Sequence, residues 1–313
     1  MGLFDKIREP VILKKDSSAK DQLTEMEQLL TEVTDPKLKV LLEHDIAAIN
    51  AGIFGEDIIL YELQNSHIPM FVLHDLYLEY EGLSAQIDFL VITRKRYFVI
   101  ECKNLYGNIA INNAGDFVRT VGNRKEGIYS PVTQGKRHLE LIKQIRGAEK
   151  GNIVIRSMFE HGFYENYRSV VVLANAKTVL DAKYAPKEIK EQVIRADHLI
   201  DYIRKVNAES GAVSSSESDM EELANFFLTS HRACKTDYLE KYRRAMLSEQ
   251  KVPTEVKVPS QQISSDITDI SAVPLCPKCG EPMVKRRATK GENVGSEFWG
   301  CSKFPRCRGI INR

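Results

Sequence analysis

The sequence has no run of about 18 or more apolar residues, so it predicts no membrane-spanning helix. Its first residues, Met-Gly-Leu-Phe-Asp-Lys-Ile-Arg, lack the apolar core of a secretory signal peptide. The sixth position also lacks the serine or threonine of a myristoylation motif. We therefore expect a cytoplasmic protein that does not bind membranes.

The chain of 313 residues has almost no net charge, because its 44 lysines and arginines nearly equal its 43 acidic residues in number. The balance is uneven along the chain. Residues 276–313 hold nine basic and three acidic residues, a charge of +6, so the rest of the chain carries about −5. A basic tail on a mildly acidic body indicates that the tail contacts nucleic acid.

Cysteine is scarce, yet four of the six cysteines lie in the last 40 residues. They form a C-x2-C pair, a gap of twenty-one residues and a C-x5-C pair, and they are Cys276, Cys279, Cys301 and Cys307. In a chain without a signal peptide, this spacing favours one tetrahedral Zn²⁺ over disulfides or a redox role. So short a segment builds little core, and the metal should supply its folding energy.

A β-hairpin is predicted by two apolar runs, 87–92 and 97–102, on either side of the polar break Thr93–Arg96. Both runs are apolar on both faces, so the hairpin should lie in a sheet that is covered on both sides. If Ile92 lies opposite Tyr97 across the turn, this pairing fixes the register of the hairpin.

In that register Asp88 lies opposite Glu101, and Glu101 shares a face with Lys103. Carboxylates about 5 Å apart repel each other unless a proton or cation lies between them, and their oxygens suit Mg²⁺ or Mn²⁺. Lys103 is placed to orient a water or to stabilise developing negative charge, which suits metal-assisted phosphodiester hydrolysis. The alternative is a cross-strand salt bridge between Lys103 and one of the two acids.

The helical patterns place two more polar side chains on apolar stripes. After a break at Gly52, residues 53–63 resume helical spacing, with Glu56 on the apolar stripe. Glu56 is either an edge residue that reaches water or a ligand that approaches the hairpin. Pro131 opens a later helix whose inward stripe includes Gln134, which is either an ordinary helix-terminal amide or a site residue.

The order of these features resembles the PD-(D/E)XK nuclease core, with Asp88 as its D and Glu101-Cys102-Lys103 as its (D/E)XK. Gly55-Glu56, Gln86-Ile-Asp88 and Ile100-Glu-Cys-Lys-Asn104 are, more closely, similar to the nuclease-related domain family, NERD. The resemblance implies that Asp88 and Glu101 bind the metal and that Lys103 positions the nucleophilic water. It also implies supporting roles for Glu56 and Gln134.

The tail Phe298-Trp-Gly-Cys-Ser-Lys-Phe-Pro-Arg-Cys307 is similar to the zinc ribbon of bacterial type IA topoisomerases, which binds single-stranded DNA. Aromatic and basic side chains alternate there, as in surfaces on which bases stack. The candidate DNA-binding residues are Phe298, Trp299, Lys303, Phe304, Arg306 and Arg308. The alternative for Trp299 is a place in the small core of the ribbon.

We therefore expect an α/β fold: a PD-(D/E)XK restriction-endonuclease-like mixed sheet flanked by helices, plus a zinc ribbon. The expected segments are a helical segment (1–44), the NERD core (45–165), a strand and helical extension (166–247), a flexible linker (248–273) and the C4 ribbon (274–313). The expected function is a metal-dependent DNA nuclease. The alternatives are a non-catalytic DNA-binding adaptor and a nuclease that acts on RNA.

Overall fold

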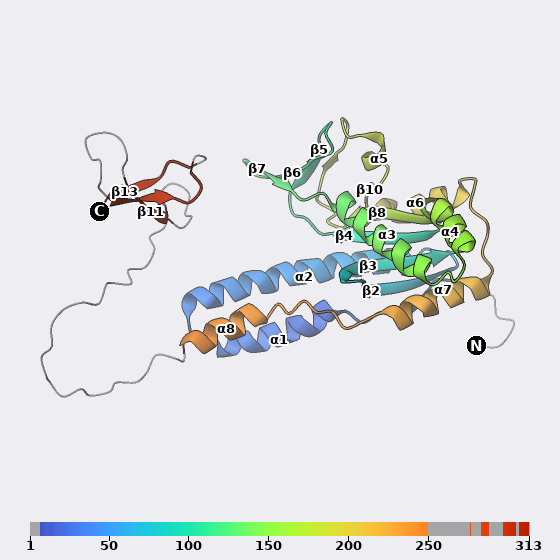
Figure 1. Cartoon of the computed structure of the whole chain (residues 1–313), viewed down its shortest axis with the longest axis horizontal. Helices are drawn as coiled ribbons and strands as arrows, with labels where there is room; N and C mark the ends of the chain where they lie inside the picture. Colours follow the sequence, from blue (N-terminus) through green and yellow to red (C-terminus); the bar gives the residue numbers. More distant parts are fainter. Residues whose placement is uncertain (1–6, 250–275, 277–282, 288–296, 305–306, 313) are drawn as a thin grey trace, which may run out of the picture. The chain divides into compact units, whose positions relative to one another are not determined.

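A computed structural model of the chain describes residues 7–249, 276, 283–287, 297–304 and 307–312. The chain divides into two compact units, Met1–Val252 and Pro253–Arg313. The first unit holds a six-stranded sheet of order β1-β2-β3-β4-β8-β10 and a four-stranded sheet of order β7-β6-β5-β9. The described part of the second unit holds a three-stranded sheet of order β11-β12-β13 (Figure 1).

The central strands form the predicted hairpin. β3 (Leu83–Thr93) pairs antiparallel with β4 (Tyr97–Lys103), and Ile92 lies opposite Tyr97 as expected. On its other side β3 pairs antiparallel with β2 (Met70–Tyr80), and β4 pairs parallel with β8 (Tyr167–Leu173). Parallel and antiparallel pairs therefore meet in one sheet, which confirms the mixed α/β fold.

The other elements complete both units. The remaining strands are β1 (Val11–Lys14), β5 (Asn108–Ile111), β6 (Phe117–Val121), β7 (Arg124–Ile128), β9 (Leu180–Asp181), β10 (Val193–Arg195), β11 (Met283–Arg287), β12 (Glu297–Cys301) and β13 (Ile310–Asn312). The helices are α1 (Ser18–Glu32), α2 (Pro36–Gln64), α3 (Pro131–Ala148), α4 (Ile153–Asn166), α5 (Lys187–Lys190), α6 (Leu199–Ala208), α7 (Glu217–Ser230) and α8 (Glu240–Glu249).

Helices cover both faces of the six-stranded sheet. One buried cluster joins β2, β3 and β4 to α3, α4 and α7, through Ile142, Phe163 and Phe227 of the three helices. A second cluster on the opposite face joins the same strands to α2 and α6, through Ile59 and Ile203. This three-layer packing explains why the strands are apolar on both faces. Among the described helices, none is long and apolar enough to cross a membrane.

α2 is one continuous helix of 29 residues, so the expected break at Gly52 is wrong. The chain enters it through Asp35, whose carboxylate accepts hydrogen bonds from the first free N–H groups, and Pro36 occupies the first turn. Gly52 lies on the exposed side of the helix. A mid-helix glycine costs only about 1 kcal/mol, and buried side chains on both sides of it, Leu42 and Ile59, outweigh that cost.

The expected helical segment (1–44) also contains a strand, because β1 adds a parallel edge strand to β2. Towards the end of the expected extension (166–247), the chain forms two helices, α7 and α8, separated by residues 231–239. α8 packs with α1 and the first half of α2 around Met26, Leu42 and Tyr242. Most of the expected linker, 248–273, lies outside the described residues.

Arg96, in the hairpin turn, is a fully buried cation whose guanidinium is held by backbone carbonyls. Those carbonyls belong to Glu165, Val206, Glu209 and Ser210. The substitution Arg96→Met is expected to lower the free energy of unfolding by about 3 kcal/mol, because it leaves buried acceptors without donors. Urea denaturation followed by circular dichroism measures this, with the exposed Lys95→Met as control. A loss below about 1 kcal/mol would contradict this account.

Candidate active site and zinc cluster

Glu101 and Lys103 lie on the α3 face of β4 and contact each other. Glu101 is 1% exposed, and Nζ of Lys103 lies 2.5 Å from its Oε1. Nδ1 of His138, a buried residue of α3, lies 3.5 Å from the other oxygen, Oε2. Neither Oε2 nor that ring nitrogen has a hydrogen-bond partner. Glu101 therefore keeps one buried carboxylate oxygen without a hydrogen bond.

Asp88 reaches β4 differently from the sequence expectation. The β3–β4 ladder ends at Phe89 and Ile100, so Asp88 and Glu101 do not form a further pair of the ladder. Instead Oδ2 of Asp88 accepts a hydrogen bond of 2.7 Å from the backbone N–H of Cys102. The Asp88 carboxylate thereby occupies the place where the two strands separate, close enough to Glu101 for their charges to interact.

Glu56 approaches the same place from α2. A Cβ atom on the preceding residue, Gly55, would lie 2.6 Å from Cβ of Asn104 and 3.1 Å from Sγ of Cys102. Only glycine lets the helix pack this closely against the end of β4. The Glu56 side chain is 20% exposed, and its charge acts on both Asp88 and Glu101. Glu56 is therefore not an edge residue that only reaches water.

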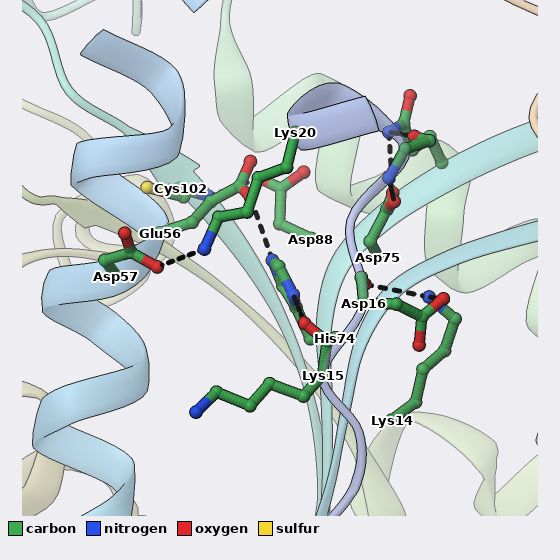
Figure 2. A network of polar contacts seen from close by, with 12 residues as sticks. Lys14, Lys15, Asp16, Lys20, Glu56, Asp57, His74, Asp75, Asp88 and Cys102 are labelled. Carbon is green, nitrogen blue, oxygen red and sulfur yellow. Dashed lines mark hydrogen bonds and ion pairs between the residues drawn. The ribbon is translucent and has the colours of Figure 1, made fainter. Parts of the chain in front are cut away.

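His74 of β2 belongs to this site and was missed by the sequence analysis. Its Nε2 lies 2.8 Å from Oε2 of Glu56, and the ring is 1% exposed. Figure 2 shows Glu56, His74 and Asp88 converging from α2, β2 and β3. The available signal was the polar pair His74-Asp75, which interrupts the run of apolar and aromatic residues over 70–78.

Gln134 lies one turn before His138 on the same face of α3 and is partly buried. Ser130 caps the start of α3, and its hydroxyl accepts a hydrogen bond from the N–H of Thr133. It packs tightly on β8, because a Cβ on Gly135 would overlap Oγ of Ser169. Gln134 therefore faces the layer that holds Glu101.

Burial and crowding shift the acidity of these groups. Burial raises the pKa of Asp88 well above its usual range, and the charges of Glu101 and Glu56 raise it further. Burial also raises the pKa of Glu101, against the effect of Lys103. For Lys103, burial lowers the pKa, but Glu101 outweighs that effect and the net pKa is raised. Burial and Lys103 together lower the pKa of His138 to about 4.

These residues fit a divalent cation. A cation would supply the missing partner of Glu101 Oε2 and offset the repulsion that raises the pKa of Asp88. All the offered ligands are hard carboxylate oxygens, which Mg²⁺ and Mn²⁺ prefer. Among the described residues, however, no three acids bring ligand atoms within 4.8 Å of one another. The site therefore suits an ion that keeps water or substrate ligands, as Mg²⁺ commonly does.

In chelator at about pH 8, the substitution Asp88→Asn is expected to raise the melting temperature. The folded-state pKa of Asp88 is raised, so the folded protein loses stability as pH rises from the ordinary value, about 3.9, through the folded value. Asparagine removes the buried charge and keeps an oxygen for the N–H of Cys102. Each kcal/mol by which the substitution raises the free energy of unfolding should raise the melting temperature by about 2–4 °C.

Differential scanning fluorimetry across pH measures this effect. The difference between Asp88→Asn and the unchanged protein should disappear at values well below about pH 4, where Asp88 is protonated in both states. At high pH, adding Mg²⁺ should also reduce the difference in melting temperature between the two proteins. A lower melting temperature of Asp88→Asn at about pH 8 would contradict the destabilising burial and crowding of the Asp88 carboxylate.

The second unit holds a cysteine cluster. The Sγ atoms of Cys276, Cys301 and Cys307 lie within 4.8 Å of one another, which suits zinc. A Cβ on Gly309 would overlap Sγ of Cys276, so only glycine fits against this sulfur. The N–H of Lys303 points at Sγ of Cys301, at 3.4 Å. The expected fourth ligand, Cys279, lies outside the described residues.

The aromatic side chains of the ribbon divide into two groups. Trp299 is partly buried against Cys276, Met283 and Cys301, so it contributes to the small core. Phe304 is 55% exposed, with the Arg286 guanidinium 5.3 Å from its ring centre. Phe298 is partly buried, Lys303 and Arg308 are exposed, and Arg306 lies outside the described residues.

The mixed sheet flanked by helices, with acids and a lysine at the end of its central hairpin, is the PD-(D/E)XK restriction-endonuclease-like architecture expected from the sequence. More particularly, residues 51–174 match the family model of the nuclease-related domain, NERD. Residues 273–312 match the model described as topoisomerase DNA binding C4 zinc finger. Both resemblances are thus confirmed. Comparison with curated proteins gave no match, and neither did comparison with solved structures.

Proposed function

We propose that this chain is a metal-dependent DNA nuclease. The observation that carries the proposal is the convergence of Asp88, Glu101 and Lys103, where burial and then acidic neighbours raise the pKa of Asp88 and one Glu101 oxygen lacks a hydrogen-bond partner. A divalent ion at this place would polarise the scissile phosphate and activate a water. Fold analogy alone would not establish this activity, because function depends on the site.

The protein groups have separate roles in this proposal. Asp88 and Glu101 hold the ion through their carboxylates. Lys103 keeps its positive charge, because its pKa is raised, so it orients the attacking water and stabilises charge that develops on the phosphate. Glu56 and Gln134 support the site from α2 and α3.

The C4 ribbon delivers DNA, with a preference for single strands, because its basic and aromatic side chains suit backbone contacts and base stacking. In the proposed division of the chain, the linker 248–273 joins this ribbon (274–313) to the core (45–165) and its extension (166–247). A tethered binding module raises the effective concentration of DNA at the core.

A cleavage assay with the full chain tests the proposal. Plasmid, linear duplex, single-stranded DNA and RNA are each incubated with Mg²⁺, Mn²⁺ or EDTA. We expect cleavage of DNA with either ion, none in EDTA, and none with Glu101→Gln, which keeps the size of the side chain. Binding without cleavage under every ion would instead establish the second candidate below, and faster cleavage of RNA than of DNA would reassign the substrate.

The second candidate is a non-catalytic DNA-binding adaptor. It is favoured by the ion pair between Lys103 and Glu101, which already occupies one carboxylate oxygen. It is also favoured by the spacing of the acids, because within the described ranges no three of them bring ligand atoms within 4.8 Å. In an adaptor the pair would serve only to stabilise the end of the sheet.

A further inference from the structure

The two neighbouring strands that carry His74 and Asp88, β2 and β3, are irregular at positions that lie side by side in the sheet. Leu73 and Leu76 of β2 both contribute to the core on the α3 face, although strand residues three apart normally point to opposite faces. The β2–β3 ladder passes over Asp75 and Asp88 without pairing them. Asp75 has φ of 52°, a conformation uncommon for residues other than glycine. The irregularity changes the face to which the two strands direct their side chains.

Asp75 is held in this conformation by its own side chain. Its Oδ2 accepts a hydrogen bond of 2.6 Å from the N–H of Ser18, at the start of α1, and its Oδ1 accepts one of 2.7 Å from Nε2 of Gln86. Unusual backbone conformations cost about 1–3 kcal/mol and persist where surrounding contacts hold them, often at functional sites. These two contacts fix the backbone immediately after His74.

The His74 ring is fixed on three sides. It stacks on Phe89, with ring centres 4.6 Å apart and an angle of 27° between the planes. Its Nδ1 lies 3.3 Å from the carbonyl oxygen of Lys15, and its Nε2 lies 2.8 Å from Oε2 of Glu56. A ring nitrogen donates only where it carries a hydrogen, and the shorter contact, from Nε2 to the Glu56 carboxylate, assigns the N–H to Nε2. The ring therefore cannot turn without losing a contact.

The Glu56 carboxylate stays at the site only if a contact opposes its rotation into solvent. The Glu56 side chain is 20% exposed and lies near two other acids, whose repulsion favours its rotation into solvent. The N–H of His74 opposes that rotation with a charge-assisted hydrogen bond. Figure 2 shows the ring between Glu56 on one side and the chain segment of Lys15 on the other.

We propose that His74 is a positioning residue, which holds the Glu56 carboxylate at the site through Nε2 while the Lys15 carbonyl and the Asp75 irregularity fix the ring. The effect of His74 on catalysis rests on the proposed nuclease function. The effect of His74 on the position of the Glu56 side chain is independent of that function.

A double-mutant cycle tests this role. His74→Phe keeps a ring and removes both ring nitrogens, His74→Gln keeps a donor near the place of Nε2, and Glu56→Ala removes the group that is held. We expect His74→Phe to lower kcat for DNA cleavage and to weaken Mn²⁺ binding in calorimetry by about 10–100-fold. His74→Gln should restore most of both. In the Glu56→Ala background, His74→Phe should change either quantity by less than about threefold.

The matched control is His44→Phe on α2. Nδ1 of His44 lies 3.4 Å from Oδ1 of an acid, Asp45, but the His44 side chain is 80% exposed. This substitution should leave kcat and Mn²⁺ binding unchanged. Equal effects of His74→Phe with and without Glu56 would overturn the positioning role, and so would unchanged kcat and Mn²⁺ affinity. An unsubstituted protein that neither cleaves DNA nor binds Mn²⁺ would instead refute the proposed nuclease function and the catalytic part of this inference with it.

Discussion

Replacing Lys103 with alanine is expected to lower the rate of DNA cleavage by about a thousandfold, while DNA binding by the ribbon persists. The side chain of Lys103 is 28% exposed, and its Nζ lies 2.5 Å from Oε1 of the buried Glu101, which raises the pKa of Lys103. In the proposed mechanism it supplies preorganised positive charge where phosphate charge develops. The substitution also leaves Glu101 buried without its cation, which disfavours the ionised form that the metal needs.

Single-turnover cleavage with saturating Mg²⁺ measures the loss. Lys95→Ala is the matched control, since it removes an exposed lysine from the turn of the same hairpin. Lys103→Arg keeps the charge and should retain more activity than Lys103→Ala, although its planar fork differs in shape from an ammonium. A Lys103→Ala protein with more than about a tenth of the normal rate would contradict the electrostatic role.

Removing zinc is expected to unfold the ribbon and leave the first unit folded. Zinc supplies about 10–16 kcal/mol to small domains of this kind, far more than three short strands provide. We therefore expect about one zinc per chain in the purified protein and close to none in Cys301→Ser. Affinity for single-stranded DNA should fall in parallel.

The single tryptophan of the chain, Trp299, reports on this change because it packs against Cys276 and Cys301. Its fluorescence should shift to longer wavelength on chelation as the ring becomes exposed. Cys234→Ser, outside the cluster, should leave both zinc content and fluorescence unchanged. An unsubstituted protein without zinc, or a Trp299 spectrum unaffected by chelation, would contradict the assignment.

Local chemistry made the hairpin and the cysteine cluster predictable from sequence. The register at Ile92 and Tyr97 follows from a four-residue polar turn, and a pair of thiolates two residues apart suits few ligands besides a metal.

What the sequence did not reveal depends on contacts between distant segments. β1 is a strand only because β2 pairs with it about 60 residues later, and its four residues carry little periodicity of their own. His74 meets Glu56 only because α2 packs on the face of β2 to which Met70 and Val72 also point. The alternating pattern assumed for Asp88 fails because the β3–β4 ladder ends one pair earlier, where β3 also leaves its pairing with β2.

The uninterrupted course of α2 ties two distant places together. Leu42 packs in the cluster with α1 and α8, and Glu56, about four turns later, belongs to the acidic site. Inserting a single residue between them would rotate one end of the helix by about 100° relative to the other. Either the packing around Leu42 would then be lost, or the Glu56 side chain would no longer point to the acidic site. The number of residues in this segment is therefore constrained even where its surface side chains are not, and only insertions or deletions close to whole turns should be tolerated.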